Sequence, residues 1–309
     1  MSAPLLVGCL SVLASVAVAQ VPPYEASSPP PSAQWNEIWR EDFDSFDNNP
    51  KTNTRWSFDL GNDWQNTTLG WGNGEYEYYT TNTKNVRSEN GTLIIEAQVE
   101  TTNKPQSSNG VVFDLTSARI ATRGHESWGF NMRFIARAKL PTARTTWPAF
   151  WMLPEPLYPG DPAATWPRGG ELDIMEHWAT PMNMVASSTH CLSTDGQTRK
   201  DTTKQVLHDN GQTYYADYHT YELQLRSDRL DYFLDDQWIY GLVKDGCLNS
   251  GIAWPWENRN FHILLNLALI EYGFDYQHNK QEIIDALNQA APVTKQFIVD
   301  YISVQSLVQ

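Results

Sequence analysis

Residues 169–178 read Gly-Gly-Glu-Leu-Asp-Ile-Met-Glu-His-Trp, and this segment constrains the fold more than any other part of the chain. It begins with alternating acidic and apolar residues, which predicts a strand with one carboxylate face and one buried face. Strict alternation breaks at the third acid, Glu176, which comes one residue late. A single-residue β-bulge at Ile174–Met175 would return Glu176 to the face of Glu171 and Asp173.

Three carboxylates on one strand face repel one another, so at least one is expected to keep its proton at neutral pH. An ionised carboxylate beside a carboxylic acid is the pair that retaining glycoside hydrolysis requires, one as nucleophile and one as proton donor. The alternative is a solvated acidic strand edge that carries no chemistry.

Short apolar-alternating runs separated by turn signals fill the chain from about residue 35 onward. The runs that predict strands are Thr92–Val99, Phe134–Leu140, Asp231–Phe233, Phe261–Leu267 and Phe297–Val304. Many short strands at this spacing favour an all-β sandwich or barrel. Residues 281–291 are the best helix candidate, and the five prolines of residues 154–168 predict a loop. We find no internal repeat, so residues 35–309 are expected to form one catalytic domain.

The first twenty residues are uncharged and mostly apolar. Ala17 and Ala19 fit a small-x-small cleavage site, so residues 1–19 are predicted to be a signal peptide of a secreted protein. A membrane anchor is the alternative, but Pro4 interrupts the run, and no later stretch is long enough to span a bilayer. Residues 20–34 contain five prolines, which predicts an extended linker rather than a packed element.

Cysteine and asparagine positions agree with an extracellular protein. Cys191 and Cys247 remain after signal removal, and an oxidising compartment would favour one disulfide between them; two buried free thiols are the alternative. Asn66 and Asn90 stand in glycosylation acceptor sequences. The Asn90-Gly91 pair also predicts a hairpin turn.

Charge and aromatic content limit the partners. A formal net charge of −14 argues against a nucleic-acid partner, which would need a clustered basic surface, and it is compatible with a neutral polymer. The 13 Trp, 14 Tyr and 11 Phe residues offer flat faces that match the apolar faces of sugar rings. Ordinary β-core packing is the alternative for many of them.

Further blocks of sequence accompany the acidic segment in a fixed order. They are Trp39–Phe43, Gly70–Glu75 with Tyr78–Thr80, Ser117–Ile120, Ala136–Pro141, Trp147–Pro154, Gly169–His177, Ser188–His190, Asn266–Ala268 and Val299–Ile302. Over roughly residues 36–305 this series resembles glycoside hydrolase family 16, and most closely its laminarinase-like endo-β-1,3-glucanases. The resemblance implies a β-jelly-roll sandwich of two curved antiparallel sheets, with a β-glucan lying in a groove across the concave face.

The resemblance also implies roles for the three acids. Glu171 matches the nucleophile of a double displacement, Asp173 its assisting neighbour, and Glu176 the general acid/base. Met175 fills the extra position that marks the bulged laminarinase form and is lacking in lichenases. This implies β-1,3 cleavage, with β-1,3-1,4-glucan left open as a further substrate.

Five residues match sugar-binding positions of the family. Trp147 and Trp151 lie four residues apart, which on a strand places them on one face, where they would stack on sugars; core packing is the alternative. Asn73, Glu75 and Arg119 match polar groups that hold sugar hydroxyls. The alternatives are turn chemistry for Asn73 and a surface ion pair for Arg119.

His190 matches a cleft histidine near the acid/base, although a lone histidine often has only a packing role. His177 follows Glu176 and should point to the opposite face, so it is interpreted as structural. The chain has no zinc-type His or Cys spacing, and no cofactor is expected in catalysis. Many family members bind calcium on the convex face; Asp300 matches one ligand, but Asp42 stands where the family usually has Glu, and its shorter side chain reaches less far.

Two other functions remain open at this stage. A cell-wall glucan transglycosylase would use the same three acids, since the choice between water and a sugar acceptor depends on other subsites. A non-catalytic β-glucan-recognition protein would use the same fold but typically lacks the paired glutamates, which are present here. We expect a monomer that binds β-glucan and has neither a nucleic-acid nor a membrane partner.

Overall fold

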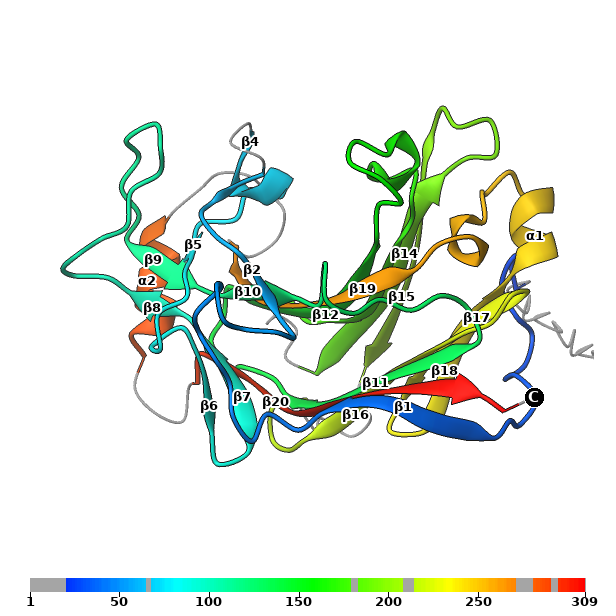
Figure 1. The fold of residues 1–309 in the computed structure, drawn as a ribbon, viewed down its shortest axis with the longest axis horizontal. Coiled ribbons are helices and arrows are strands. Elements are labelled where there is room, and N and C mark those ends of the chain that lie inside the picture. The colour runs from blue at the N-terminus through cyan, green and yellow to red at the C-terminus, as the bar shows by residue number, and fades with distance from the viewer. Residues whose placement is uncertain are drawn as a thin grey trace, which may run out of the picture.

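The computed structural model describes residues 21–64, 68–178, 183–207, 214–270, 280–289 and 294–308. The predicted signal peptide, residues 1–19, and the acceptor Asn66 lie outside these ranges. Within them, two large antiparallel sheets lie one above the other and curve in the same sense (Figure 1). No helix in the described part of the chain is long and apolar enough to cross a membrane.

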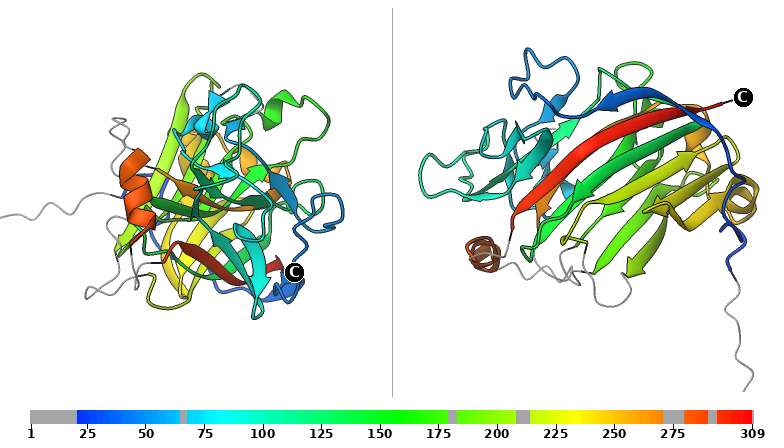
Figure 2. Two further views of the ribbon diagram at one scale, coloured as in Figure 1. Left: turned by 90° about the vertical axis from the view of Figure 1, so that its left-hand side faces the viewer. Right: turned by 90° about the horizontal axis from the view of Figure 1, so that it is seen from below.

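The first sheet contains eight strands: β1 (Trp35–Glu41), β6 (Val86–Glu89), β7 (Thr92–Glu96), β11 (Met132–Lys139), β16 (His219–Leu225), β17 (Arg229–Leu234), β18 (Gln237–Val243) and β20 (Gln296–Leu307). Its strand order is β18-β17-β16-β11-β20-β7-β6, and β1 also pairs with β20. The right-hand view of Figure 2, from below, shows these antiparallel strands lying side by side along the molecule.

The second sheet contains seven strands: β2 (Ser57–Asp59), β10 (Arg119–Ala121), β12 (Thr146–Pro154), β13 (Glu171–Glu176), β14 (Met184–Leu192), β15 (Arg199–Leu207) and β19 (Phe261–Leu269). Its order is β15-β14-β13-β12-β19-β10-β2, so the acidic segment forms a central strand. A central strand is held on both sides by backbone hydrogen bonds, which makes it a rigid support for side chains.

Smaller elements surround the two sheets. They are the short strands β3 (Asp63–Trp64), β4 (Thr68–Leu69), β5 (Tyr78–Tyr79), β8 (Gln98–Val99) and β9 (Leu115–Ser117), the helices α1 (Lys244–Asn249) and α2 (Lys280–Leu287), and the 3₁₀ turns η1 (Gly70–Gly72), η2 (Pro162–Ala164) and η4 (Pro255–Glu257). In Figure 1 the helices lie at opposite ends of the sandwich. The core therefore lies between the two large sheets, and the smaller elements surround it.

The space between the sheets is filled by apolar side chains from both. Leu172 and Met175 of β13 are fully buried there, in one cluster with Phe134 of the first sheet. Burying one such side chain stabilises a fold by roughly 1.5–3 kcal/mol. Two tyrosines of the first sheet also donate hydrogen bonds to carbonyls of β14: Tyr232 to Ser188 at 2.9 Å and Tyr240 to Ser187 at 3.1 Å. These bonds attach β14, the strand next to the acidic strand β13, to the first sheet.

These elements confirm the predicted all-β jelly-roll class. The run Thr92–Val99 differs in detail, because β7 and β8 divide it between two sheets. The helix predicted at 281–291 ends at Leu287, and its last two predicted residues lie outside the described ranges. The hairpin turn at Asn90-Gly91 is confirmed, since both residues have positive φ (53° and 72°) and join β6 to β7.

Part of the proline-rich segment pairs with a strand, a contact that the prediction of an extended linker did not include. Its backbone pairs with β18 through Val243 N–H to the Tyr24 carbonyl (2.9 Å) and Ala26 N–H to the Gly241 carbonyl (2.8 Å). At α1, a Cβ on Gly246 would clash with the Pro23 carbonyl oxygen. The sequence could not predict this contact, because composition indicates how stiff a segment is and not which strand edge lies beside it.

Cys191 and Cys247 are buried and unpaired in this structure, which corresponds to the alternative of two free thiols. Burial raises the pKa of both thiols to about 12. Both are therefore protonated and poorly reactive at neutral pH.

Candidate active site

Strand β13 carries the bulge predicted from the sequence. Asp173 pairs with Ser188 and Glu176 pairs with Ala186, so three steps along β13 match two along β14. The pairing with β12 shifts at the same place, next to Trp151. One extra residue therefore interrupts the alternation, as predicted.

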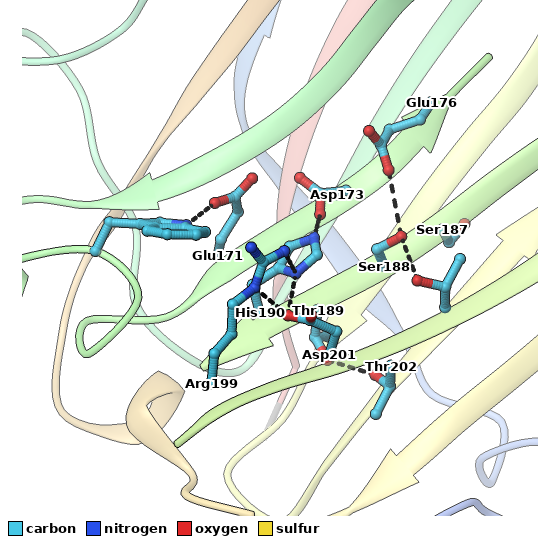
Figure 3. Close-up of polar contacts among 12 residues, drawn as sticks. Glu171, Asp173, Glu176, Ser187, Ser188, Thr189, His190, Arg199, Asp201 and Thr202 are labelled. Carbon is cyan, nitrogen blue, oxygen red and sulfur yellow. Dashed lines mark hydrogen bonds and ion pairs between the residues drawn. The ribbon is translucent and has the colours of Figure 1, made fainter. Parts of the chain in front are cut away.

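The bulge places three carboxyl groups on the side of β13 that faces away from the core (Figure 3). Asp173 and Glu176 are 3% and 8% exposed, and Glu171 is half-buried. The intervening Leu172 and Met175 face the core. One strand thus presents a compact acidic surface, the acidic face, formed by Glu171, Asp173 and Glu176.

Gly170 directly precedes β13, and only glycine fits at this position. Its φ is +86°, and a Cβ there would lie 2.7 Å from Cγ of Pro255 and 2.8 Å from Nε1 of Trp256. This close contact with η4 sets where β13 begins, and it therefore sets the position of Glu171.

Burial and mutual repulsion perturb all three acids. Burial, followed by the charge of Asp173, raises the pKa of Glu171 to about 8. Burial, followed by the charge of Glu171, raises the pKa of Glu176 to about 7. The pKa of Asp173 lies well above its ordinary range, again through burial first and the charge of Glu176 second. The acidic face therefore holds at least one proton at neutral pH, as expected.

Each glutamate has its own hydrogen-bond donors. The indole N–H of Trp147 on β12 donates to Glu176 at 3.1 Å, and the hydroxyl of Ser188 donates to it at 3.2 Å. The indole N–H of Trp166 donates to Glu171. Trp166 was missed in the sequence analysis; the available signal was an aromatic residue in the proline-rich loop that leads into β13.

His190 lies on β14 directly opposite Glu171. Its Nε2 is 3.1 Å from Oδ2 of Asp173, and its Nδ1 is 2.6 Å from Oδ1 of Asp201 (Figure 3). The structure therefore brings His190 to the acidic face, where it contacts Asp173 rather than the predicted acid/base Glu176, and adds Asp201. Arg199 completes this group, with Nε 2.7 Å from the same Asp201 oxygen.

A second polar cluster lies on neighbouring strands of the same sheet. The Arg119 guanidinium lies between two indole rings, 4.6 Å from the Trp71 centroid and 4.7 Å from the Trp151 centroid. Its Nε is 2.9 Å from Asp59, and the arginine is only 4% exposed, so the expected alternative of a surface ion pair does not hold. Trp151 donates its indole N–H to Asn266 at 2.8 Å. The two indoles and the guanidinium form one stacked unit.

Asn73 and Glu75 extend this cluster. The Asn73 amide donates to Oε1 of Glu75 at 3.0 Å, and the Tyr79 hydroxyl donates to Oε2 at 2.9 Å. The Asn266 amide in turn donates to the Tyr79 hydroxyl at 3.1 Å. Hydrogen bonds thus connect Glu75 to the indole of Trp151 through Tyr79 and Asn266, and the stacking of Arg119 on Trp151 joins four of the predicted sugar-binding residues in one network.

Two other predictions concern residues outside this network. His177 is fully buried, and its Nδ1 lies 2.7 Å from the Met184 carbonyl, which supports its structural interpretation. Burial lowers its pKa to about 4. Asp42 and Asp300, considered for calcium, instead bind Arg40 at 2.7 Å and Arg137 at 2.5 Å.

The family model and the relatives that match this chain point to the same family. Residues 58–225 match the model of the XgeA-like catalytic domain of glycoside hydrolase family 16. The chain is 33% identical to the β-glucanase of Rhodothermus marinus over 238 residues, covering 76% of each chain. It is also 33% identical to the glucan endo-1,3-β-glucosidase of Cryptopygus antarcticus over 245 residues, covering 76% of this chain and 80% of the relative.

Solved structures agree with the sequence matches. The endo-β-1,3-glucanase of Pyrococcus furiosus superposes with a TM-score of 0.71 at 29% identity, covering 90% of this chain and 96% of that one. The acidic face, its buried carboxyls and this extent of similarity lead to the same assignment. The chain belongs to glycoside hydrolase family 16 and is a glycoside hydrolase.

Proposed function

We propose that the protein is an endo-β-1,3-glucanase that hydrolyses internal bonds of β-glucans with retention of anomeric configuration. The observation that carries this proposal is the bulge in β13, which places Glu176 on the same face as Glu171 and Asp173. The named activities of similar proteins support the linkage: β-glucanase, glucan endo-1,3-β-glucosidase and endo-β-1,3-glucanase. Mixed-linkage β-1,3-1,4-glucan is a second substrate to be tested.

Glu171 and Glu176 divide the chemistry between them. The Glu171 carboxylate attacks the anomeric carbon, while Glu176 gives its proton to the departing glycosidic oxygen, and a glycosyl ester on Glu171 results. Glu176, now ionised, takes a proton from a water molecule that attacks the same carbon. The ester bond then breaks, and both glutamates return to their starting states.

Asp173 shares a proton with Glu171 and holds that proton when Glu171 is ionised. It is hydrogen bonded to Glu171, so the two carboxyl groups share a proton, and Glu171 is ionised when that proton lies on Asp173. The pKa values of Glu171 (about 8) and Glu176 (about 7) do not by themselves distinguish nucleophile from acid. The order of the two glutamates in the family motif supports the assignment.

The cluster beside the acids supplies sugar-binding groups. Trp147 and Trp151 are half-buried on β12, so each ring keeps some exposed surface for stacking on sugars, although the Arg119 guanidinium already lies against the Trp151 ring. Asn73, Glu75 and Arg119 provide the hydroxyl-binding amide, carboxylate and guanidinium. We propose that they bind the glucan on one side of the scissile bond.

We further propose that the protein is secreted after removal of residues 1–19 and acts as a monomer on polysaccharide alone. Secretion is supported by the uncharged apolar start of the chain and the Ala17-Val-Ala19 cleavage pattern. Asn90, the exposed first residue of the Asn90-Gly91-Thr92 acceptor on the β6–β7 turn, is accessible to a glycosylation enzyme.

Digestion of laminarin, lichenan and cellulose side by side, with linkage analysis, tests the function. We expect rapid loss of laminarin viscosity with oligosaccharide products, and the β-anomer appearing first by proton NMR. Glu171→Gln should abolish turnover, whereas Glu89→Gln, on the exposed β6–β7 hairpin, should not change it. Inversion of configuration, or cleavage of β-1,4 bonds only, would overturn the proposal. Products longer than the substrate at high oligosaccharide concentration would identify a transglycosylase instead.

A further inference from the structure

The side chain of Asp201 is placed to act on the acidic face through His190. The two residues lie opposite each other in the β14–β15 pairing, and His190 Nδ1 is 2.6 Å from Asp201 Oδ1. On its other side, His190 Nε2 is 3.1 Å from Asp173. The imidazole therefore bridges an aspartate of β15 and an aspartate of the acidic face (Figure 3).

The contacts of Asp201 determine which ring nitrogen of His190 carries hydrogen. Burial raises the pKa of Asp201, but hydrogen bonds from His190 and Arg199 outweigh it and leave that pKa below its ordinary value. An ionised carboxylate only accepts hydrogen bonds, so its 2.6 Å contact favours a proton on Nδ1 of His190 over the longer contact of 3.3 Å, in which Arg199 would donate to an unprotonated Nδ1. Nε2 is then the atom that meets Asp173.

Arg199 ties this arrangement to the other side of the acidic face. Its Nε is 2.7 Å from Asp201, and its guanidinium lies 4.8 Å from the ring centroid of Trp166, which donates to Glu171. Contacts therefore run from Glu171 through Trp166, Arg199, Asp201 and His190 to Asp173. This series of contacts therefore begins and ends on neighbouring carboxyl groups of β13, those of Glu171 and Asp173.

We propose that Asp201 is a positioning residue that acts through His190, holding the imidazole so that Nε2 exchanges a proton with Asp173. The inference rests on the proposed function. When the proton lies on Asp173, its O–H donates to Nε2; when it moves to Nε2, an imidazolium faces an aspartate anion. No proton is gained or lost. A carboxylate behind a functional imidazole fixes its orientation and raises its basicity in the same way elsewhere.

The charged groups that face His190 set the expected direction of the pH effect. They are Glu171, Asp173 and Glu176 from β13 and Asp201 and Arg199 from β15. A positive His190 favours ionised Glu171. Removing the Asp201 charge takes away the group that stabilises a positive ring in this position, so Glu171 should keep its proton to higher pH.

Asp201→Asn tests the proposal, because it keeps the shape of the side chain and removes its charge. We expect kcat to fall about tenfold with KM changed less than about twofold, and the acid limb of the kcat/KM profile on laminarin to move upward. Asp235→Asn is the matched control. Asp235 also binds a histidine Nδ1, that of His219 at 2.6 Å, and its side chain is 48% exposed against 43% for Asp201, but it lies in the turn between β17 and β18 of the first sheet. A profile and kcat indistinguishable from those of Asp235→Asn would overturn the proposal.

Nitrogen-15 NMR of the His190 ring in the wild-type protein tests the same geometry without a substitution. The neutral ring is expected to carry its proton on Nδ1, with the signal identified by its loss in His190→Gln. A neutral ring protonated on Nε2 would overturn the inference. If the wild-type protein cleaves no β-glucan, the proposed function fails, and the measured tautomer still decides whether Asp201 orients His190.

Discussion

The indole nitrogen of Trp147 lies 3.1 Å from Oε1 of Glu176. A residue predicted to stack on sugars is therefore also bonded to the proposed acid/base. An N–H donated to a carboxylate favours its charged form, so this contact holds the pKa of Glu176 lower than burial alone would set it.

Trp147→Phe should accordingly raise the pKa of Glu176. The ring surface remains for stacking, but the donor is lost, so the alkaline limb of the kcat/KM profile should move up by about half a unit to one unit. Trp151→Phe is the control, because its indole N–H binds Asn266 and not an acid. It should change KM and leave the limb in place; equal shifts in both variants would exclude a specific effect of Trp147.

The proton on Glu176 should set the upper pH limit of activity. Its pKa is raised to about 7 by burial and by the charge of Glu171, and the acid must be protonated for the leaving group to depart. Because Glu171, whose pKa is raised to about 8, must be ionised at the same time, activity on laminarin should peak between about pH 7 and 8 and decline at higher pH. A substrate with a dinitrophenyl leaving group needs no proton and should lose this decline when formation of the glycosyl ester is measured by its burst. Undiminished laminarin cleavage at pH 9 would contradict the assignment.

How far the sequence predicts this site depends on where each residue lies. The alternation and its interruption at Ile174–Met175 reside in one strand, so the bulge could be predicted from adjacent residues alone. Asp201 and Trp166 could not be placed this way, because their positions depend on the β14–β15 pairing and on a loop path. Nothing local in the sequence states which residue of β15 stands opposite His190.

The same distinction applies to the fold. The Asn90-Gly91 turn follows from local backbone preference and was predicted correctly. The packing of Tyr24 and Ala26 against β18 depends on an edge formed more than 200 residues later in the chain, so composition alone could not predict it.

Glu171→Gln should stabilise the protein at alkaline pH while removing activity. The pKa of Glu171 is raised in the folded state from 4.5 to about 8, so its contribution to stability is complete below 4.5 and is lost as pH rises through 8. Glutamine avoids that loss. After allowance for solvent screening of this half-buried group, we expect a gain on the order of 2 kcal/mol at pH 9 relative to pH 5, measured by denaturant unfolding. A gain independent of pH would contradict the raised pKa.

Gly170→Ala should displace the start of β13. Positive φ and the contacts with Pro255 and Trp256 together should cost roughly 2–3 kcal/mol in unfolding free energy and reduce kcat by moving Glu171. Gly160→Ala is the control, since Gly160 has φ +78° but nothing within 4 Å of its added Cβ. It should cost about 1 kcal/mol, the strain alone, and leave kcat unchanged. Equal losses would show that contact with η4 does not position β13.

Trapping the covalent intermediate tests the central claim most directly, namely that the bulged strand presents Glu171 as nucleophile and Glu176 as acid. A dinitrophenyl 2-deoxy-2-fluoro-β-laminaribioside should inactivate the protein with one equivalent of sugar bound, because the fluorine slows breakdown of the ester. Tandem mass spectrometry should locate that sugar on Glu171. A sugar located on Glu176 would reverse the two roles, and the absence of any covalent adduct together with inversion of configuration would contradict double displacement.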